Sequence, residues 1–486
     1  MVIAEKLEPL IGLEVHAQLL TKSKMYCSCS AQYADSPPNR LVCAVCGGMP
    51  GALPVVNARA VEYTVRTALA LDCQVDEWSK FDRKNYSYAD LPKGYQISQY
   101  DMPIGRDGTL EFRSGDETRR CGIVRVHLEE DTGKTTHTTV DGREVSLVDY
   151  NRSGVALMEI VGQPELHSAE DAREYFAALR QLLMFLHVCD GNLQEGSMRA
   201  DVNVSVHRPG EPLGTKVEIK NLNSFRAVQR SLEYEIQRQT DLLSRGEPVI
   251  HETRGWSEER QMTLGQRTKE LAHDYRYFPE PDLPYLKFSP GQLEDIRAHL
   301  PELPAAKRER FQTAYGLPPA LSDVLTSEEH IASYFEDAVR RDTSISPDTV
   351  AKWITGEVLR LLKDTNAGDD SIPVSAPNLA KLLGMVQTGA VSNTAAKAVL
   401  EDMFSSGEEP DSVVARLGLE RIGDASVTEG LVEQVLRENP SKVEQFRAGK
   451  LQVQQSLFGD VMKLSKGKAD PSQVRDILSR KLDETG

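Results

Sequence analysis

Four segments of this 486-residue chain alternate between apolar and polar residues, and this pattern constrains the fold more than any other feature. They are residues 11–18, 122–129, 199–206 and 216–220. A period of two places every second side chain on the same side, which is typical of a β-strand with one buried face. We therefore expect four strands of a sheet that turns one face toward the protein interior.

The polar positions of these segments combine acids, imidazoles and cations. They are Glu14, His16 and Gln18; Arg125, His127 and Glu129; Arg199, Asp201, Asn203 and Ser205; and Lys216, Glu218 and Lys220, with Val124, Val126 and Leu128 among the core positions opposite. An antiparallel sheet with one solvated face is the ordinary alternative. Solvated strands, however, favour Thr, Lys and Ser over Glu and His spaced two residues apart. If the segments share a sheet, its polar side suits a divalent metal ion and a phosphate.

Four of the cysteines form two close pairs, with the spacing Cys-x-Cys and Cys-x-x-Cys. Two short pairs separated by a loop are typical of a four-thiolate zinc site, because each pair supplies two corners of a tetrahedron. The alternatives are reactive thiol pairs or disulfides, which a reducing cytosol disfavours. We therefore expect Cys27, Cys29, Cys43 and Cys46 to hold a structural Zn²⁺ that fixes the loop leading to residues 47–51.

The chain is acidic, with a formal net charge of −16. Such a protein is not attracted as a whole to nucleic acid or to an anionic membrane, so neither DNA nor a membrane is an expected partner. No apolar run is long enough to span a bilayer, and the N-terminus lacks the features of a signal peptide, which makes the cytoplasm the expected location. Basic residues outnumber acidic ones from Pro440 onward, where Lys463, Lys466 and Lys468 cluster. This end is the candidate for RNA contacts, with a solvated helix face as the alternative.

The spacing of apolar residues changes along the chain. Up to about residue 290 strands and turns dominate, with helices predicted from Ser168 to His187 and after Ser224. From residue 293 the pattern is helical with few strand signals. The sequence therefore predicts an α+β protein with a strand-rich catalytic domain at 1–292, a helical domain at 293–405 and a small helical tail domain at 406–486.

The densest chemistry lies in the segment RVHLEEDTGKT at 125–135. Its final GKT resembles the end of a P-loop, but Leu128 occupies the position where that motif needs a glycine. Kinase signatures such as H-R-D and D-F-G are absent too. The three acids after Leu128 instead suit Mg²⁺ at the end of a strand. The run LPKGYQISQ at 91–99 offers backbone N–H groups and a lysine to a phosphate, with a plain turn as the alternative.

Several motifs taken together resemble one family. They are IGLEVH at 11–16, LPKGYQISQ at 91–99, RVHLEEDTGK at 125–134, DYNRSG at 149–154 with MEIV at 158–161, GSMRADVN at 196–203, EIKNLNSFR at 218–226 and DYRYFPEPDLP at 274–284. In this order they resemble the B subunit of the bacterial glutamyl-/aspartyl-tRNA amidotransferases, over nearly the whole chain. Departures from the family pattern, at Ala44, Ala89, Ala156 and Gln266, fall on none of the predicted metal ligands.

The resemblance implies an enzyme of tRNA-dependent amidation. Such an enzyme takes misacylated Glu-tRNA(Gln) or Asp-tRNA(Asn), phosphorylates the side-chain carboxylate with ATP and Mg²⁺, and lets ammonia displace the phosphate. The ammonia comes from glutamine in an amidase partner, the A subunit, and a small C subunit helps to hold the complex together. The implied fold is a kinase-like cradle around a β-sheet active site, then a helical domain and a YqeY-like tail that binds tRNA.

The match to the family also points to individual residues. The catalytic candidates are Glu14, His16, Glu129, Glu130, Glu159 and Asp201; those for ATP, phosphate or substrate are Lys93, Arg152, Arg199, Glu218 and Lys220; and those for Mg²⁺ are Glu14, His16, Glu129 and Glu195. The competing interpretations are a metal-dependent RNA hydrolase, since Glu, His and Asp serve that chemistry too, and a tRNA-binding scaffold without catalysis. The sequence does not decide which of the two aminoacyl-tRNAs is the substrate.

Overall fold

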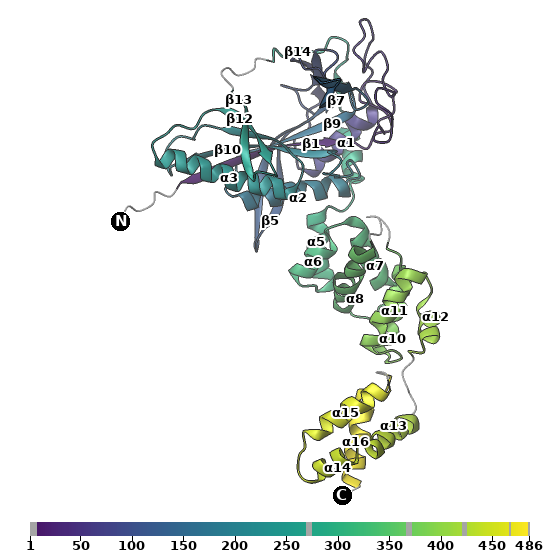
Figure 1. The fold of residues 1–486 in the computed structure, drawn as a ribbon. Helices are drawn as coiled ribbons and strands as arrows, with labels where there is room; N and C mark the ends of the chain where they lie inside the picture. Colours follow the sequence, from purple (N-terminus) through teal and green to yellow (C-terminus); the bar gives the residue numbers. More distant parts are fainter. Residues whose placement is uncertain (1–6, 269–274, 366–371, 420–424, 466–467, 485–486) are drawn as a thin grey trace. The chain divides into compact units, whose positions relative to one another are not determined.

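The structure, a computed structural model, describes residues 7–268, 275–365, 372–419, 425–465 and 468–484. The chain divides into two compact units, residues 1–305 and residues 306–486. The first contains a large sheet with helices against it, and the described part of the second is helical, so the predicted α+β class is confirmed (Figure 1). The domain boundaries expected after residues 292 and 405 remain predictions.

An eight-stranded sheet forms the centre of the first unit, in the order β13-β12-β11-β10-β1-β9-β6-β5. Its strands are β1 (Glu8–Gln18), β5 (Gly105–Ser114), β6 (Glu117–Glu130), β9 (Ala156–Gly162), β10 (Met198–His207), β11 (Val217–Leu222), β12 (Glu252–Ser257) and β13 (Met262–Thr268). Strand β1 pairs antiparallel with both β10 and β9, and β9 pairs antiparallel with β6. All four segments with alternating residues therefore contribute strands to this one sheet.

One predicted core position is wrong, because β6 contains an irregularity. The register of β6 against β9 shifts between Ile123 and Arg125. As a result Ile123 is buried in the core, and Val124, which the alternation assigned to the core, is only half-buried. Beyond the shift Val126 and Leu128 are core residues, as expected. A one-residue slip moves side chains to the opposite face, and the sequence pattern gives no sign of it.

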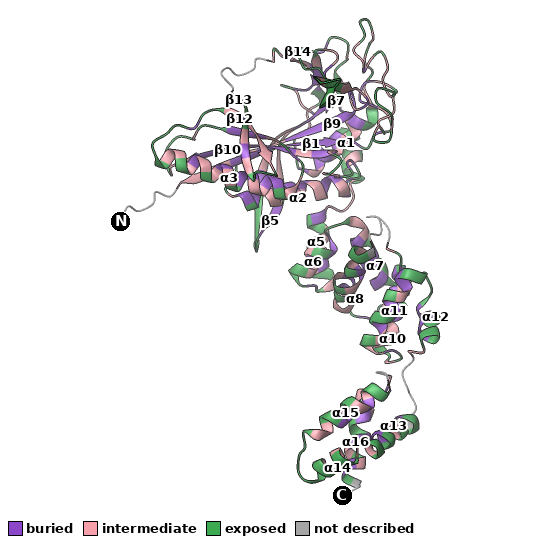
Figure 2. Ribbon diagram, in the orientation of Figure 1, coloured by how far each residue is buried: buried purple, intermediate pink, exposed green. Residues whose placement is uncertain are grey.

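Two helices, α2 (Ala169–Phe185) and α3 (Phe225–Ser244), lie side by side against the sheet (Figure 1). Both start where the capping residues predict, since the side chains of Ser168 and Ser224 accept hydrogen bonds from backbone N–H groups of the first turn. Their apolar residues join those of the strands in one hydrophobic cluster, and Figure 2 colours much of the central strands as buried. The helices thus cover the apolar face and leave the polar face for other contacts.

Helix α1 (Ala58–Ala70) has no counterpart among the elements predicted from sequence. Its N-terminus is capped by the side chain of Asn57, which accepts hydrogen bonds from two backbone N–H groups. Its buried positions include Thr64, Thr67 and Ala68, and both threonine hydroxyls donate to carbonyls one turn earlier. The amphipathic period of this segment and the capping Asn57 are both signals from which the sequence could have predicted the helix.

Several short strands lie outside the large sheet. Strand β3 (Asp82–Asn85) pairs with β4 (Tyr95–Ser98) and β14 (Phe278–Pro279), β2 (Trp78–Ser79) pairs with β15 (Leu286–Lys287), and β7 (Lys134–Val140) forms a hairpin with β8 (Arg143–Asp149). The helix α4 (Pro290–Ala298) follows β15. Strand β4 contacts β6, and this contact brings side chains of β3 and β4 to the end of β6 that carries the predicted acids.

The second unit is built from helices in its described residues. They are α5 (Pro304–Tyr315), which begins at the boundary, α6 (Pro319–Leu325), α7 (Glu329–Arg341), α8 (Pro347–Trp353), a π-helical turn (Ile354–Val358), α9 (Leu359–Thr365), α10 (Ala376–Gln387), α11 (Asn393–Ser406), α12 (Pro410–Leu417), α13 (Ala425–Glu438), α14 (Pro440–Arg447), α15 (Val453–Leu464) and α16 (Pro471–Glu484). They form two separate hydrophobic clusters, one before and one after residues 420–424. Among the helices described here, none combines the length and the apolar character needed to cross a membrane.

Candidate active site and metal-ligand groups

Three strands bring His16, Glu159 and His127 into one row across the polar face of the sheet. The register places Glu159 of β9 opposite His16 of β1 on one side and opposite His127 of β6 on the other. Its Oε2 atom lies 3.6 Å from Nε2 of His16 and 3.3 Å from Nε2 of His127. The Nδ1 atoms of both imidazoles are buried without a hydrogen-bond partner among the described residues. Buried polar atoms without a partner call for an explanation, and a bound ion is one.

Glu129 completes this arrangement. His16, Glu129 and Glu159 each offer one ligand atom within 4.8 Å of those of the other two, and we call them the carboxylate–histidine group. Oε1 of Glu129 accepts a hydrogen bond from Ser98 at 2.7 Å and lies 3.6 Å from Nζ of Lys84. Its Oε2 atom accepts from Gln96 at 3.1 Å. Residues of β3 and β4 therefore orient this carboxylate on the sheet.

Neighbouring charges keep the two acids of the group ionised. Burial would raise the pKa of Glu129, but Lys84 and His127 outweigh burial and bring the pKa down to about 2. Burial also opposes ionisation of Glu159, yet His127 and His16 hold its pKa well below the usual value. At neutral pH the group therefore presents two carboxylates beside the ring of His16. Ionised carboxylates are ligands that Mg²⁺ takes, so the residues present fit this ion.

Asp131, directly after β6, gathers two arginines. Arg199 donates to its two oxygens at 3.3 and 3.4 Å, and Gln18 donates to Oδ2 at 2.7 Å. Nε of Arg152 lies 3.8 Å from Oδ1, while the guanidinium group donates to the next two backbone carbonyls at 2.9 and 2.7 Å. Against the effect of burial, Arg199 and Arg152 hold the pKa of Asp131 below its usual range. Because Arg199 lies opposite His16 in the register, this cluster adjoins the carboxylate–histidine group.

Glu130 and Lys93 form an ion pair beside this cluster. The backbone N–H of Ile97 also donates to Glu130, at 3.0 Å. The predicted phosphate-binding run at 91–99 is only partly a loop, since Tyr95–Ser98 is strand β4. A phosphate would therefore have to compete with Glu130 for Lys93.

On the other side of β1, Lys220 bridges two acids. Its Nζ atom lies 3.1 Å from Asp201 and 2.9 Å from Glu218. Glu14 lies opposite Asp201 in the register and accepts a hydrogen bond from Asn203 at 3.0 Å. Burial and the nearby carboxylates raise the pKa of Glu14. Glu14 is thus more easily protonated than the two acids of the carboxylate–histidine group.

The acids and cations of the polar face differ in how far their side chains are exposed to solvent. The side chains of Glu129 and Glu159 are only 3% and 7% exposed. Those of Lys84, Arg199 and Lys220 are 21%, 20% and 32% exposed. Cations that reach solvent while neutralising buried acids present positive charge to an approaching anion. The face therefore suits a divalent cation bound by its buried acids and a phosphate bound by its more exposed cations.

Most of the predicted site residues lie on this face. They are Glu14, His16, Glu129, Glu159, Arg199, Asp201, Glu218 and Lys220, with Glu130, Lys93 and Arg152 around the end of β6. The structure does not bring Glu195 to them: it is exposed in the turn before β10. Sequence reasoning missed Lys84, Gln96 and Ser98, because β3 and β4 are too short for a recognisable alternation.

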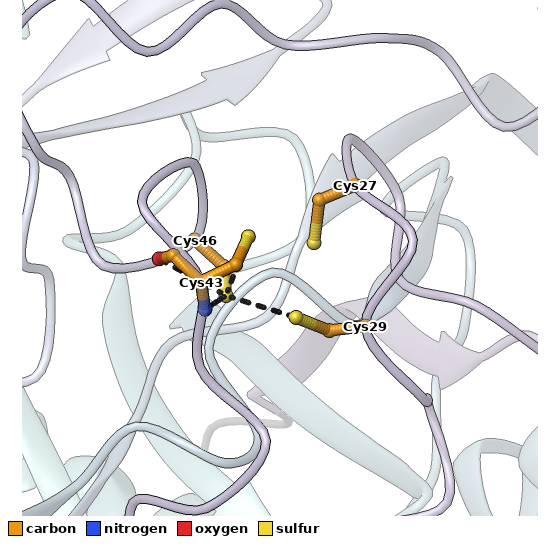
Figure 3. A group of neighbouring side chains, drawn as sticks. All are labelled: Cys27, Cys29, Cys43 and Cys46. Atoms are coloured by element: carbon orange, nitrogen blue, oxygen red, sulfur yellow. Dashed lines mark hydrogen bonds between the residues drawn. The ribbon is translucent and has the colours of Figure 1, made fainter.

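The four cysteines of the predicted zinc site converge from two loops (Figure 3). Their sulfur atoms lie within 4.8 Å of one another, with Sγ of Cys46 3.9 Å from that of Cys43 and 4.0 Å from that of Cys29. All four thiols are free, which argues against the disulfide alternative. A tetrahedral zinc with bonds of about 2.3 Å needs sulfur atoms about 3.8 Å apart. The four-cysteine group therefore fits a metal ion.

The thiols of this group are not equivalent. Hydrogen bonds from Cys27 and from the backbone of Cys43, helped by Lys24, outweigh burial and bring the pKa of Cys46 down to about 4. Burial and the neighbouring thiols raise the pKa of Cys29 to about 11. A thiolate is the form that binds metal, so the buried Cys46 is the sulfur best prepared for it.

Comparisons with known proteins agree with this geometry. Residues 9–294 match the family model of the GatB/GatE catalytic domain, and residues 333–482 match that of the GatB domain. The chain is 49% identical to the B subunit of the aspartyl/glutamyl-tRNA(Asn/Gln) amidotransferase of Thermomicrobium roseum, over 98% of this chain and 99% of the relative. It is 47% identical to the protein of the same name from Thermoanaerobacter pseudethanolicus, with the same coverage. By family model and by full-length relatives alike, the chain belongs to the GatB family.

Proposed function

We propose that this chain is the subunit of a tRNA-dependent amidotransferase that activates the side chain of a misacylated tRNA with ATP and converts it to an amide. The substrates are Glu-tRNA(Gln), Asp-tRNA(Asn) or both. The observation that carries the proposal is the layered polar face, in which buried acids are overlaid by Lys84, Arg199 and Lys220. The names of full-length relatives supply the reaction that such a face would perform.

The reaction needs a leaving group, because a carboxylate is a poor acyl donor. Attack of the side-chain carboxylate on the γ-phosphate of ATP gives an acyl phosphate and ADP. Attack of ammonia on the carbonyl carbon then forms the amide and expels inorganic phosphate. Both steps move negative charge onto phosphate oxygens, so the main task of the protein is to position these groups and offset that charge.

The polar face supplies residues for this task. Lys84, Arg199 and Lys220 would contact the phosphates or the substrate carboxylate, because they are cations of the face that reach solvent. His16, Glu129 and Glu159 would hold Mg²⁺, which when bound neutralises charge on the phosphates. Glu14 and Asp201 complete the set of acids that face the substrate.

The four-cysteine group would hold a Zn²⁺ ion. All four corners of its tetrahedron are filled by protein, which is the pattern of a structural site and not of a catalytic one. Its expected contribution is to fold the two loops that carry the cysteines.

Other subunits complete the enzyme. The ammonia comes from an amidase partner, the A subunit, and a small C subunit holds the complex together. In this chain residues 1–292 form a kinase-like cradle for the reaction, residues 293–405 a helical domain, and residues 406–486 a tail that binds tRNA. The match of residues 333–482 to the GatB domain model supports the assignment of the helical half to this family.

Reconstitution with the A and C subunits tests the proposal. The assay follows the formation of Gln-tRNA(Gln) and Asn-tRNA(Asn), and the ADP released for each amide, with glutamine and separately with ammonium chloride. We expect one ADP per amide with either nitrogen donor. Cleavage of the RNA without ATP would favour the hydrolase interpretation, and full activity in a complex that carries Glu129→Gln would favour the scaffold.

A further inference from the structure

Lys24 is a fully buried lysine next to the four-cysteine group. It is 1% exposed. Its ammonium group donates to the carbonyl of Leu41 at 2.8 Å and to the carbonyl of Tyr150 at 3.3 Å, and it lies 3.5 Å from Sγ of Cys46. An ammonium group has three donors, and these contacts use all of them. A charge buried in this way is retained only where its partners compensate for lost hydration.

The position of Lys24 suits a metal-bound group. Four thiolates around a divalent ion carry a net charge of about −2, and a buried anion of this kind is stabilised by a nearby cation. Lys24 is the ammonium group in contact with these sulfurs among the described residues. Residues that contact a metal ligand from outside commonly tune how tightly the metal is held.

The same ammonium group of Lys24 also reaches the segment that carries Arg152. Tyr150, whose carbonyl accepts from Lys24, begins the segment 150–155. Further hydrogen bonds tie the cysteine loops to this segment, among them the following. Asn151 accepts from the N–H of Leu41 at 2.9 Å, Ser153 donates to the carbonyl of Cys46 at 3.3 Å, and Met25 donates its N–H to the carbonyl of Gly154 at 2.7 Å.

The same segment is bonded to the polar face of the sheet. The N–H of Gly154 donates to the carbonyl of Asp131 at 2.8 Å, and the N–H of Asp131 donates to the carbonyl of Val155 at 2.8 Å. Gly154 has a φ angle of +84°, and a Cβ atom there would lie 3.2 Å from Cβ of Cys46. The segment thus packs closely between the four-cysteine group and the acids at the end of β6, at a backbone conformation that favours glycine.

We propose that Lys24 is a positioning residue that couples occupation of the four-cysteine group by metal to the placement of Arg152 and Asp131 on the polar face. With metal bound, the charge of the group holds the ammonium group in place, and the ammonium group holds Tyr150. Without metal, both cysteine loops and the segment 150–155 lose this anchor. The effect on catalysis rests on the proposed function, whereas the coupling itself is a property of the fold.

The test compares Lys24→Met and Lys24→Arg with the wild-type full-length chain, and Lys22→Met serves as the matched control. Lys22 is an exposed lysine two residues away. Zinc content and the rate of zinc release to a coloured chelator report on the four-cysteine group. Hydrogen exchange at the amides of Gly154 and Val155 reports on the segment. The rate of ADP formation in the reconstituted complex, with ammonium as nitrogen donor, reports on the polar face.

We expect Lys24→Met to release zinc roughly 10- to 100-fold faster and to lower kcat by a similar factor. Exchange at Gly154 and Val155 should rise as well, while the KM for tRNA stays near the wild-type value because the tail is untouched. Lys24→Arg should recover most of each property, and Lys22→Met should resemble wild type. Removing zinc from the wild-type chain should raise exchange at the same two amides.

Three results would overturn the coupling. They are a wild-type chain without metal, faster zinc release without any change in exchange or kcat, and a lower kcat with normal zinc retention and normal exchange. If Lys24→Met does not fold, Asn151→Leu removes a parallel link and should raise exchange in the segment while leaving Lys24 in place. Zinc release and exchange do not depend on catalysis, so a wild-type complex that fails to form amide would reject the proposed function and still allow the coupling to be judged.

Discussion

The four-cysteine group and the carboxylate–histidine group belong to the same unit of the protein, but they are assembled differently. The cysteines come from two loops that are close in the sequence, between residues 27 and 46. His16, Glu129 and Glu159 come from three strands that are far apart in the sequence and adjacent in the sheet. The first group depends on local spacing, and the second depends on the order and register of the strands.

The surroundings of the two groups differ as well. In the four-cysteine group protein sulfurs would fill all four ligand positions of a tetrahedral metal ion, and Lys24 contacts Cys46. The carboxylate–histidine group is overlaid by Lys84, a cation that reaches solvent. A site filled by protein ligands stabilises a loop, whereas a site with a cation at its entrance can admit an anionic substrate. This contrast leads us to expect structural effects from changes in one group and catalytic effects from changes in the other.

The largest effect is expected for Glu129→Gln. The change keeps the size of the side chain but removes the charge of a proposed Mg²⁺ ligand, and it should remove about 4 kcal/mol of transition-state stabilisation, roughly a thousandfold in rate. ADP release dependent on Glu-tRNA(Gln), with ammonium as nitrogen donor, measures this loss. Glu144→Gln on the exposed hairpin strand β8 is the matched control. Near-normal ADP release by the Glu129 variant would mean that the active site lies elsewhere.

Cys46→Ser should act on stability first. Replacing one thiolate should eliminate tight zinc binding, and because metal binding contributes to folding, the first unit should lose at least about 3 kcal/mol of unfolding free energy. Elemental analysis and thermal unfolding measure the two effects. Cys73→Ser changes a free, buried cysteine outside the group, so it should leave the zinc content unchanged. A wild-type chain expressed with ample metal and purified without zinc would contradict this prediction.

A smaller effect is expected for Arg199→Met, and it should depend on pH. Arg199 and Arg152 lower the pKa of Asp131 in the folded state. The ion pair therefore stabilises the folded state at every pH above the ordinary pKa of an aspartate. This stabilisation is lost only as the pH falls through the lowered pKa. Without Arg199 the first unit should lose about 2 kcal/mol at pH 8.

The same variant should lose less at pH 5. The pKa of Asp131 rises when Arg199 is removed, so the folded variant takes up a proton that the wild type does not. Urea unfolding of both proteins at the two pH values measures the difference. An equal loss at pH 5 and pH 8 would contradict this prediction, because it would mean that Arg199 is not needed to keep Asp131 ionised at pH 5.

The smallest effect is expected outside both groups, in the tail. Lys463→Gln and Lys468→Gln should each weaken tRNA binding by roughly 3-fold and make it less dependent on salt. The reason is that each substitution removes one contact between a lysine and a phosphate of the tRNA. Lys466 lies outside the described residues. Removing the chain from Pro440 would cut through the third hydrophobic cluster, which joins α13 to later helices, so point substitutions are the better test. Unchanged affinity and salt dependence would show that the tail does not contact the tRNA backbone.

The sequence alone determined the features that depend on local patterns. Alternation predicted β1, β10 and β11 and the side on which their polar side chains lie, because a strand with one buried face has an apolar residue at every second position. Ser168 and Ser224 located the starts of two helices, because a capping hydroxyl bonds within its own first turn. The spacing of four cysteines indicated a metal-ligand group, because its ligands come from short neighbouring loops.

Only the tertiary structure decided which residues meet. The strand order β10-β1-β9-β6 and its register join His16 to Glu159, and a period of two specifies neither. The register shift before Arg125 exchanged the roles of Ile123 and Val124, and the packing of β3 against the sheet brought in Lys84. These contacts depend on how segments that are distant in the sequence pack together. The local residue pattern of a single segment does not specify the free energy of that packing.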